Sequence, residues 1–200
     1  MVRAKPIRSL VPAPVSPFEH LSVLISIIIG LGLTHLLASI HRLVQARDRV
    51  TLHWLPLLWV VLIFITQVEW WWASFGWRNK VEWNFFYFLF ILLSPVSMYL
   101  SAAFVLPDVE AGESYDLKQY YFATRRWLFL SIALGPAVDA VRRAGQAGSI
   151  TDFGALSNAV SAVLVGSMAF TEKLWYHVLV TLTVGALFLS FIVSSALELR

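Results

Sequence analysis

The chain has 200 residues, of which 58% are hydrophobic and only 14% are charged. Soluble domains are about 45–50% apolar and about 25% charged, so this composition excludes an ordinary soluble domain. There is no cysteine, which excludes a disulfide framework, a thiolate metal site and a cysteine nucleophile. The net charge is +3. The basic residues of the chain flank apolar runs, and this placement favours contact with anionic lipid over nucleic-acid binding.

Residues 1–17 are predicted to form a flexible tail. This segment is basic and then rich in proline, with Arg3, Lys5, Arg8, Pro12, Pro14 and Pro17. A basic start before an apolar run also suggests a signal peptide. The run that follows is too long for the core of such a peptide, and it has no clear small-residue cleavage site. We therefore expect residues 18–200 to form a single transmembrane domain.

Six segments have the length and composition of membrane spans, since about 20 mainly apolar residues cross the hydrocarbon core. They are Phe18–Val44, His53–Trp77, Trp83–Leu106, Leu117–Val141, Phe153–Phe170 and Leu174–Leu197. Continuous apolar runs of this kind indicate helices rather than the alternating strands of a barrel. The sequence thus predicts an all-α membrane protein, a bundle of six transmembrane helices with short loops. The fifth segment is short and partly polar, and a chain without it would have five spans.

The charge distribution predicts an orientation. We call the face that carries the N-terminus side A and the opposite face side B. If Arg125 and Arg126 are left out because they lie well inside the fourth span, side A has Arg3, Lys5, Arg8, Arg78, Lys80, Arg142, Arg143 and Arg200, and side B has Arg42, Arg47, Arg49, Lys118 and Lys173. Because cytoplasmic loops carry the excess of Lys and Arg, both termini are expected in the cytoplasm.

Glu69 is the most informative residue of the chain, because it interrupts the second apolar run about 12 Å from side A. A carboxylate at such a position costs about 2.5–3.5 kcal/mol and needs a partner, water or a proton. Glu69, with Gln67 before it, is therefore a candidate buried proton or cation site. A structural ion pair with a side A arginine, or a snorkelling side chain, is the alternative.

A second group of polar residues lies towards side B. His35, Arg125 and Arg126 are each about 13 Å deep, and His177 is about one turn in from the surface. Convergence of these four would create a candidate site for an anion or a lipid head group, since arginine forks match phosphate and carboxylate. Snorkelling arginines and a hydrogen-bonded structural histidine are the alternatives. The two groups predict two half-depth sites, one acidic and one basic.

The first span also carries small residues every four positions, at Ser26, Gly30, Thr34 and Ala38. Such a stripe lets another helix approach closely. It predicts a packing surface, either within the bundle or in a homo-oligomer that forms through this helix.

No catalytic, metal or cofactor motif accompanies these groups. There is no HExxH, Walker loop or GxGxxG, and no nucleophile–histidine–acid order. Haem ligation needs two histidines at matched depth on facing helices, whereas His35 and His177 differ by about five residues of depth. We expect no metal and no cofactor, and the absence of these motifs favours a function other than catalysis.

Three stretches of the sequence resemble uncharacterised bacterial multi-pass integral membrane proteins of about this length. They are Ser16-Pro17-Phe18-Glu19-His20 with Ile29-Gly30-Leu31-Gly32-Leu33-Thr34-His35-Leu36-Leu37; Gln67-Val68-Glu69-Trp70-Trp71; and Leu106-Pro107-Asp108 with Asp116-Leu117-Lys118-Gln119-Tyr120-Tyr121-Phe122 and Arg125-Arg126-Trp127. The resemblance covers residues 16–130. It implies the multi-pass architecture and a location in a bacterial inner membrane, and it implies no activity or substrate.

The sequence therefore favours a small transporter, a channel-like protein or a sensor of the same build, which uses the buried polar residues. The alternative is a structural or partner-binding membrane subunit whose polar residues hold the bundle together. A membrane enzyme that acts on lipid is the third hypothesis, and it lacks a nucleophile or metal set. The expected partner is the bilayer, including anionic lipid.

Overall fold

Six α-helices joined by short connections make up the computed structural model, which describes residues 17–79, 84–110 and 112–198. The helices are α1 (Pro17–Gln45), α2 (Trp54–Ser74), α3 (Phe85–Val105), α4 (Leu117–Ala147), α5 (Phe153–Ser167) and α6 (Leu174–Glu198). The short elements are the 3-10 helices η1 (Arg47–Arg49), η2 (Phe75–Asn79) and η3 (Met168–Phe170) and the strands β1 (Val50–Thr51) and β2 (Tyr115–Asp116). The predicted tail and the expected start of the third span at Trp83 lie outside the described residues.

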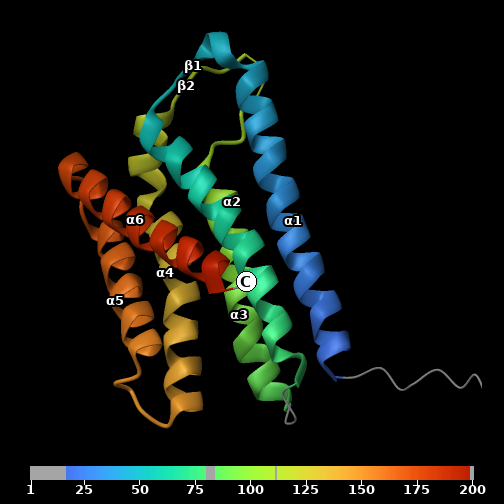
Figure 1. Ribbon diagram of the computed structural model, residues 1–200. Coiled ribbons are helices and arrows are strands. Elements are labelled where there is room, and N and C mark those ends of the chain that lie inside the picture. The colour runs from blue at the N-terminus through green and yellow to red at the C-terminus, as the bar shows by residue number, and fades with distance from the viewer. Residues whose placement is uncertain (1–16, 80–83, 111, 199–200) are drawn as a thin grey trace, which may run out of the picture.

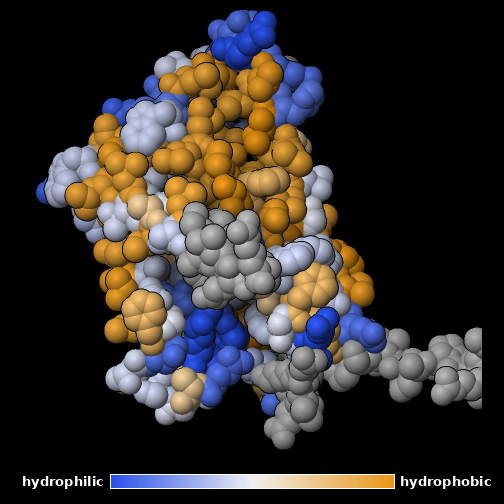
Figure 2. Space-filling view, viewed as in Figure 1, coloured by the Kyte–Doolittle hydropathy of each residue, from blue (hydrophilic) through white to orange (hydrophobic). Residues whose placement is uncertain are grey.

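Four helical segments are long and apolar enough to cross a membrane: Phe18–Gln45, Trp54–Arg78, Phe85–Val105 and Phe153–Phe170. They expose large apolar side chains such as Leu31, Val61 and Val163. Figure 2 accordingly shows hydrophobic residues over most of the middle of the molecule and hydrophilic residues towards both ends. The all-α class and several membrane-length helices are confirmed. The six-span bundle stays a prediction, because α4 is more polar and the apolar part of α6 with described side chains is shorter.

Side-chain caps fix where three of the helices begin. Asn84 accepts from the Tyr87 N–H at 2.8 Å, and Asp152 accepts from the Ala155 N–H at 2.9 Å. Asp116 accepts from two backbone N–H groups at the start of α4. These caps satisfy backbone donors that a helix start leaves free. Gly148, with φ 63°, ends α4 in the left-handed conformation that glycine adopts most readily.

The helices are arranged around α3 and α4 (Figure 1). The most extensive contacts are those of α4 with α5, α3 with α4, and α1 with α3. At side B the parallel strands β1 and β2 pair Val50 with Tyr115 and Thr51 with Asp116, which joins two helix connections. The last helix, α6, runs obliquely across the others (Figure 1) and packs less extensively, against α5, α2 and η3.

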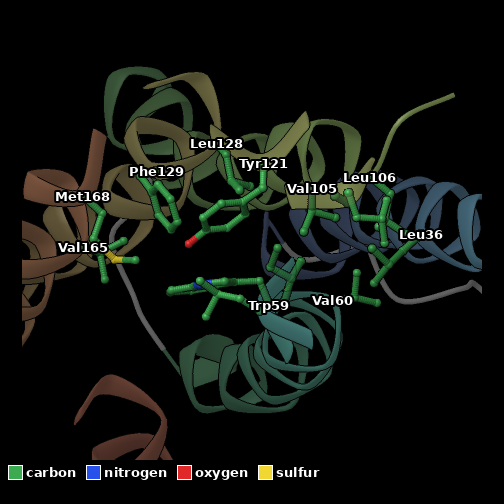
Figure 3. Close-up of a cluster of buried hydrophobic side chains, with 14 of the residues drawn as sticks. Leu36, Trp59, Val60, Val105, Leu106, Tyr121, Leu128, Phe129, Val165 and Met168 are labelled. Atoms are coloured by element: carbon green, nitrogen blue, oxygen red, sulfur yellow. The ribbon is translucent and has the colours of Figure 1, made fainter. Parts of the chain in front are cut away.

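The largest buried cluster extends from α1 and α3 across α2 and α4 to the end of α5, η3 and α6. Trp59 and Tyr121 both pack edge-on against Phe129, with ring centroids 5.3 Å and 5.6 Å away, and Leu128 and Met168 complete this part of the core (Figure 3). A smaller cluster of Leu21, Ile25, Ile29 and Ile91 joins α1 to α3. These clusters determine which face of each helix turns inwards.

The contact between α1 and α2 is built around Gly32 and Gln67. A Cβ on Gly32 would stand 2.6 Å from the Gln67 Oε1 atom, so only glycine leaves room for this amide. Gln67 is fully buried, and neither its Nε2 nor its Oε1 has a hydrogen-bond partner among the described residues. The amide is therefore held by close packing against α1.

The stripe of small residues on α1 faces outwards. Ser26, Gly30 and Thr34 are exposed and Ala38 is half-buried. A Cβ on Gly30 would meet no heavy atom within 4 Å, and Ser26 Oγ accepts from Trp71 Nε1 at 3.1 Å. Close approach within the described part of the chain uses Gly32 instead. Packing of the stripe in a homo-oligomer stays a prediction.

Gly32→Ala is expected to destabilise the protein, because the new methyl group displaces the Gln67 side chain. Overpacking of this kind costs about 1–3 kcal/mol. Adding Gln67→Ala should restore part of the loss, since it removes the obstructing amide. Gly30→Ala is the matched control and should leave stability unchanged. Thermal unfolding in detergent measures all four proteins, and equal effects of the two glycine substitutions would contradict this account.

Candidate functional site

Among the described residues of side A, the carboxylate of Asp139 has the most hydrogen-bond partners. Asp139 lies in the C-terminal third of α4. Its Oδ1 atom lies 2.7 Å from Arg142 Nε and 2.6 Å from Arg142 Nη2. Its Oδ2 atom accepts from Arg143 Nε at 3.1 Å and from Asn158 Nδ2 of α5 at 3.2 Å. Asp139 thus forms ion pairs with two arginines of its own helix and links α4 to α5. We call Asp139, Arg142, Arg143 and Asn158 the Asp139 network.

All three nitrogens of Arg142 have partners within the chain. Its third nitrogen, Nη1, donates to Gln146 Oε1 at 2.9 Å, and its Cζ atom lies 5.3 Å from the ring centroid of Trp77 in η2. A guanidinium over an indole ring in this geometry gains a cation–π interaction. Only 10% of the Arg142 side chain is exposed. Arg142 therefore ties α4 to the end of α2 and is poorly placed to bind anything else.

Arg143 is bound less completely. Its Nε atom donates to Asp139, but neither Nη nitrogen has a hydrogen bond to the described residues, and 41% of the side chain is exposed. The side chain lies over Gly154 at the start of α5, where a Cβ would stand 2.8 Å from Nη1. Gly154 therefore makes the room that the Arg143 guanidinium occupies.

Glu69 lies next to this network. It is half-buried on α2, and its electrostatic interactions are with Asp139 and Arg143. Its carboxylate forms neither a hydrogen bond nor an ion pair within the described part of the chain. Gln67 precedes it by two positions, about 200° around the helix, and packs against Gly32 of α1 instead. The structure thus places Glu69 and Gln67 on different faces, not in one site.

The basic residues predicted to converge towards side B lie in three places. Arg125 forms an ion pair with Glu172, with Arg125 Nη2 2.5 Å from Glu172 Oε1, and interacts electrostatically with His177. Arg126 is exposed on the outer face of α4. His35 packs beside Tyr99 between α1 and α3, with ring centroids 6.3 Å apart. The structure brings together Arg125 and His177 and separates the other two.

His177 is the centre of a buried network of its own. Its Nε2 lies 3.1 Å from the carbonyl oxygen of Thr171, so Nε2 carries the proton and donates it. Its Nδ1 is then the acceptor for the Tyr121 hydroxyl at 2.9 Å. The rings of Tyr121, Phe122 and Phe129 surround the imidazole at 5.1–5.4 Å. Both ring nitrogens are satisfied within the chain, which is typical of a structural histidine.

Sequence reasoning placed Arg142 and Arg143 on side A but did not recognise that they form one site with Asp139. Their spacing of three and four residues was the available signal, because it puts all three on one face of a helix. Nothing comparable pointed to Asn158, Trp77 or Gly154, which tertiary packing brings from other elements.

Two pockets lie at opposite ends of the molecule. A pocket of about 570 Å³ on side A is lined by Trp72, Ala73, Phe75, Gly76 and Arg78. A smaller one of about 140 Å³ on side B is lined by Arg42, Gln45, Ala46, Arg49, Val109 and Glu110. Within the described ranges, no group of three or more His, Asp or Glu side chains is arranged to hold a metal ion.

The fold and these sites define an all-α protein with membrane-length helices and a charged network between them. Comparisons of the chain with protein-family models, curated proteins and solved structures found no match.

Asp139→Asn is expected to destabilise the protein by about 2–4 kcal/mol. It leaves two arginines without their anion, and the cost stays somewhat below that of a fully buried pair because 20% of Asp139 is exposed. Asp108→Asn is the matched control, since Asp108 is 76% exposed in its pair with Arg42 and should cost less than about 1 kcal/mol. Chemical or thermal unfolding in detergent compares them, and equal losses would contradict a central role for Asp139.

Tyr121→Phe is expected to cost about 1–3 kcal/mol, because it leaves the buried Nδ1 of His177 without a donor. The neighbouring Tyr120→Phe should be nearly neutral, because no hydrogen bond of the Tyr120 hydroxyl is formed with the described residues. Unfolding measurements on the two variants test this. A neutral Tyr121→Phe would mean that His177 is not held as described.

Proposed function

We propose that the chain is a small multi-pass membrane protein, a transporter, a channel-like protein or a sensor, in which Glu69 takes up and releases a proton. In this proposal the six helices all span the membrane of a bacterial cell and both termini are cytoplasmic. The observation that carries it is a half-buried carboxylate in a membrane-length helix with no hydrogen-bond partner among the described residues.

The lengths of α4 and α6 support six spans. With a rise of 1.5 Å per residue, their 31 and 25 residues extend roughly 46 and 37 Å, beyond the hydrocarbon thickness of about 30 Å. Two of the α4 charges are also largely covered, since only 16% of the Arg125 side chain and 10% of the Arg142 side chain are exposed. A charged helix is tolerated in a bundle when its polar face turns towards protein.

A proton is favoured over a metal cation at Glu69. Calcium and magnesium need six or more oxygen ligands, and the Asp139 oxygens are already used by nitrogen donors. The guanidinium of Arg143, which interacts electrostatically with Glu69, also repels a metal cation. A proton needs only the carboxylate itself.

A structural or partner-binding subunit is the second candidate function. The saturated Asp139 and His177 networks favour it, because both hold the bundle together without a ligand. The two functions make different predictions for Glu69, which has no bond to lose.

Glu69→Gln is expected to abolish proton uptake into proteoliposomes, measured with an internal pH dye after an acid jump, while thermal stability in detergent stays unchanged. Glutamine keeps the shape of the side chain but cannot ionise. The exposed Glu110→Gln is the matched control and should transport like the unmodified protein. Unchanged flux in Glu69→Gln, or a loss of stability alone, would favour the structural subunit.

A further inference from the structure

A small cavity on side B lies between two helix connections. It has a volume of about 140 Å³ and is lined by Arg42, Gln45, Ala46, Arg49, Val109 and Glu110. The first four residues belong to the end of α1 and the connection after it, and the last two belong to the connection that follows α3. Pockets for drug-sized ligands have about 300–1,000 Å³, whereas one water takes about 30 Å³. The cavity therefore has room for a small ion or one polar head group.

Arg42 is one of two arginines in the wall of this cavity. Its Nη2 atom donates to Ser39 Oγ at 3.0 Å and to Asp108 Oδ1 at 2.7 Å. Its Nε atom is buried and has no hydrogen-bond partner among the described residues. A buried donor without a partner costs about 1–3 kcal/mol, and more when the group is charged. A ligand with an acceptor oxygen, bound in the adjoining cavity, removes this cost.

Arg49 is the second arginine of the cavity, and it has no carboxylate partner. Its Nη1 atom donates to the carbonyl oxygen of Glu113 at 3.2 Å and to that of Glu110 at 3.5 Å. Its Nε and Nη2 atoms form no hydrogen bond, and its guanidinium forms no ion pair, within the described part of the chain. Two of its three nitrogens are therefore available to a ligand.

The two arginines together point to an oxyanion. Guanidinium groups in the wall of one small cavity repel each other, because each is always positively charged. The exposed acids nearby leave the unbonded nitrogens as they are: Asp108 bonds only Nη2 of Arg42, and the Glu110 carboxylate pairs with neither arginine. A phosphate offers several oxygens and negative charge to both guanidinium groups at once. Two arginines and an unpartnered buried donor thus favour the same class of ligand.

The position of the cavity is suited to a phosphate at a membrane surface. Arg42 lies in the last turn of α1, a membrane-length helix. Exposed apolar side chains lie close to the two arginines in the chain, at Val44, Leu52 and Trp54. Figure 2 shows hydrophilic residues at the end of the molecule that carries β1, directly above the apolar middle (compare Figure 1). Basic residues at such a boundary attract anionic lipid head groups.

From this geometry we infer that Arg42 and Arg49 form a phosphate-binding site on side B, between the α1–α2 and α3–α4 connections. The inference is independent of the proton site proposed at Glu69. Two sources supply the ligand, the phosphate of a lipid head group and free inorganic phosphate. Either ligand strengthens the link between the two connections, because Arg49 already contacts carbonyl oxygens of the second one.

The test measures binding to the full chain, purified in dodecyl maltoside without phosphate. Isothermal titration with inorganic phosphate detects the free ion. Native mass spectrometry with phosphatidylglycerol detects the lipid, with diacylglycerol of the same acyl chains as the control that lacks phosphate. We expect saturable binding of at least one phosphate compound, and the compound that binds identifies the source. Binding of neither, or equal binding of phosphatidylglycerol and diacylglycerol without binding of the free ion, would overturn the inference.

Variants of the arginines assign the binding to this cavity. Arg49→Gln should weaken binding by at least about tenfold, because a charged fork is lost. Arg42→Lys should weaken it by about as much, since lysine keeps the charge but has no Nε–H. Arg47→Gln is the matched control, because Arg47 lies in the same 3-10 helix, is 76% exposed and does not line the cavity. Its binding should be unchanged.

Asp108→Asn gives a prediction of the opposite sign. It keeps the shape of the partner of Arg42 but removes its negative charge, so affinity for phosphate should rise roughly two- to fivefold. A role of Arg42 in stability alone predicts no such gain. Unchanged affinity in a folded Arg49→Gln protein, an equal loss in Arg47→Gln, or no gain in Asp108→Asn would each contradict the site. The melting temperature of every variant shows whether it is folded.

Discussion

The carboxylate of Asp139 is the interaction on which the side A end of the structure depends. Two consecutive arginines on α4 would be costly between apolar helices, and Asp139, one turn earlier, forms an ion pair with each of them. The same carboxylate accepts from Asn158 of α5, and Arg142 reaches Trp77 of η2. One anion thus joins α4 to α5 and to the end of α2. At side B, an exposed ion pair and the two-residue strands β1 and β2 join the ends of the helices instead.

The central position of α4 follows from its charges. Its contacts with α3 and α5 are among the most extensive in the molecule, although it is the most polar of the long helices. A helix with several charges is stable among apolar neighbours only if they cover its polar face. The same requirement explains why Arg125 is partly covered and paired with Glu172. Arg126 faces outwards, so within a membrane its guanidinium needs polar surroundings at the depth where it lies.

Continuous apolar runs predicted the helices well, because a segment buried in lipid must satisfy its backbone hydrogen bonds within itself. Four membrane-length helices are confirmed, and Glu69 was recognisable as a charge without an evident partner. Depth along a span was less informative, since it does not say which helices are neighbours. His35 and Arg125 share a depth but lie on α1 and α4, and α1 packs mainly on α3 and α2. The rotation of α1 likewise depends on where Gly32 admits Gln67, which small-residue spacing alone did not reveal.

The polar groups of this molecule differ in how completely they are bonded, and this difference separates groups that hold the fold together from groups that have unbonded polar atoms left over. His177 has both nitrogens bonded, and Asp139 is contacted by four nitrogens. Gln67 is unbonded but fully sealed between helices, so no ligand reaches it. Only a group that is both incompletely bonded and accessible exchanges a proton or an ion without breaking the fold. Glu69 and Arg143 meet both conditions. They are therefore the groups at which the proposed proton exchange is best tested, because changing either of them leaves most of the bonded framework intact.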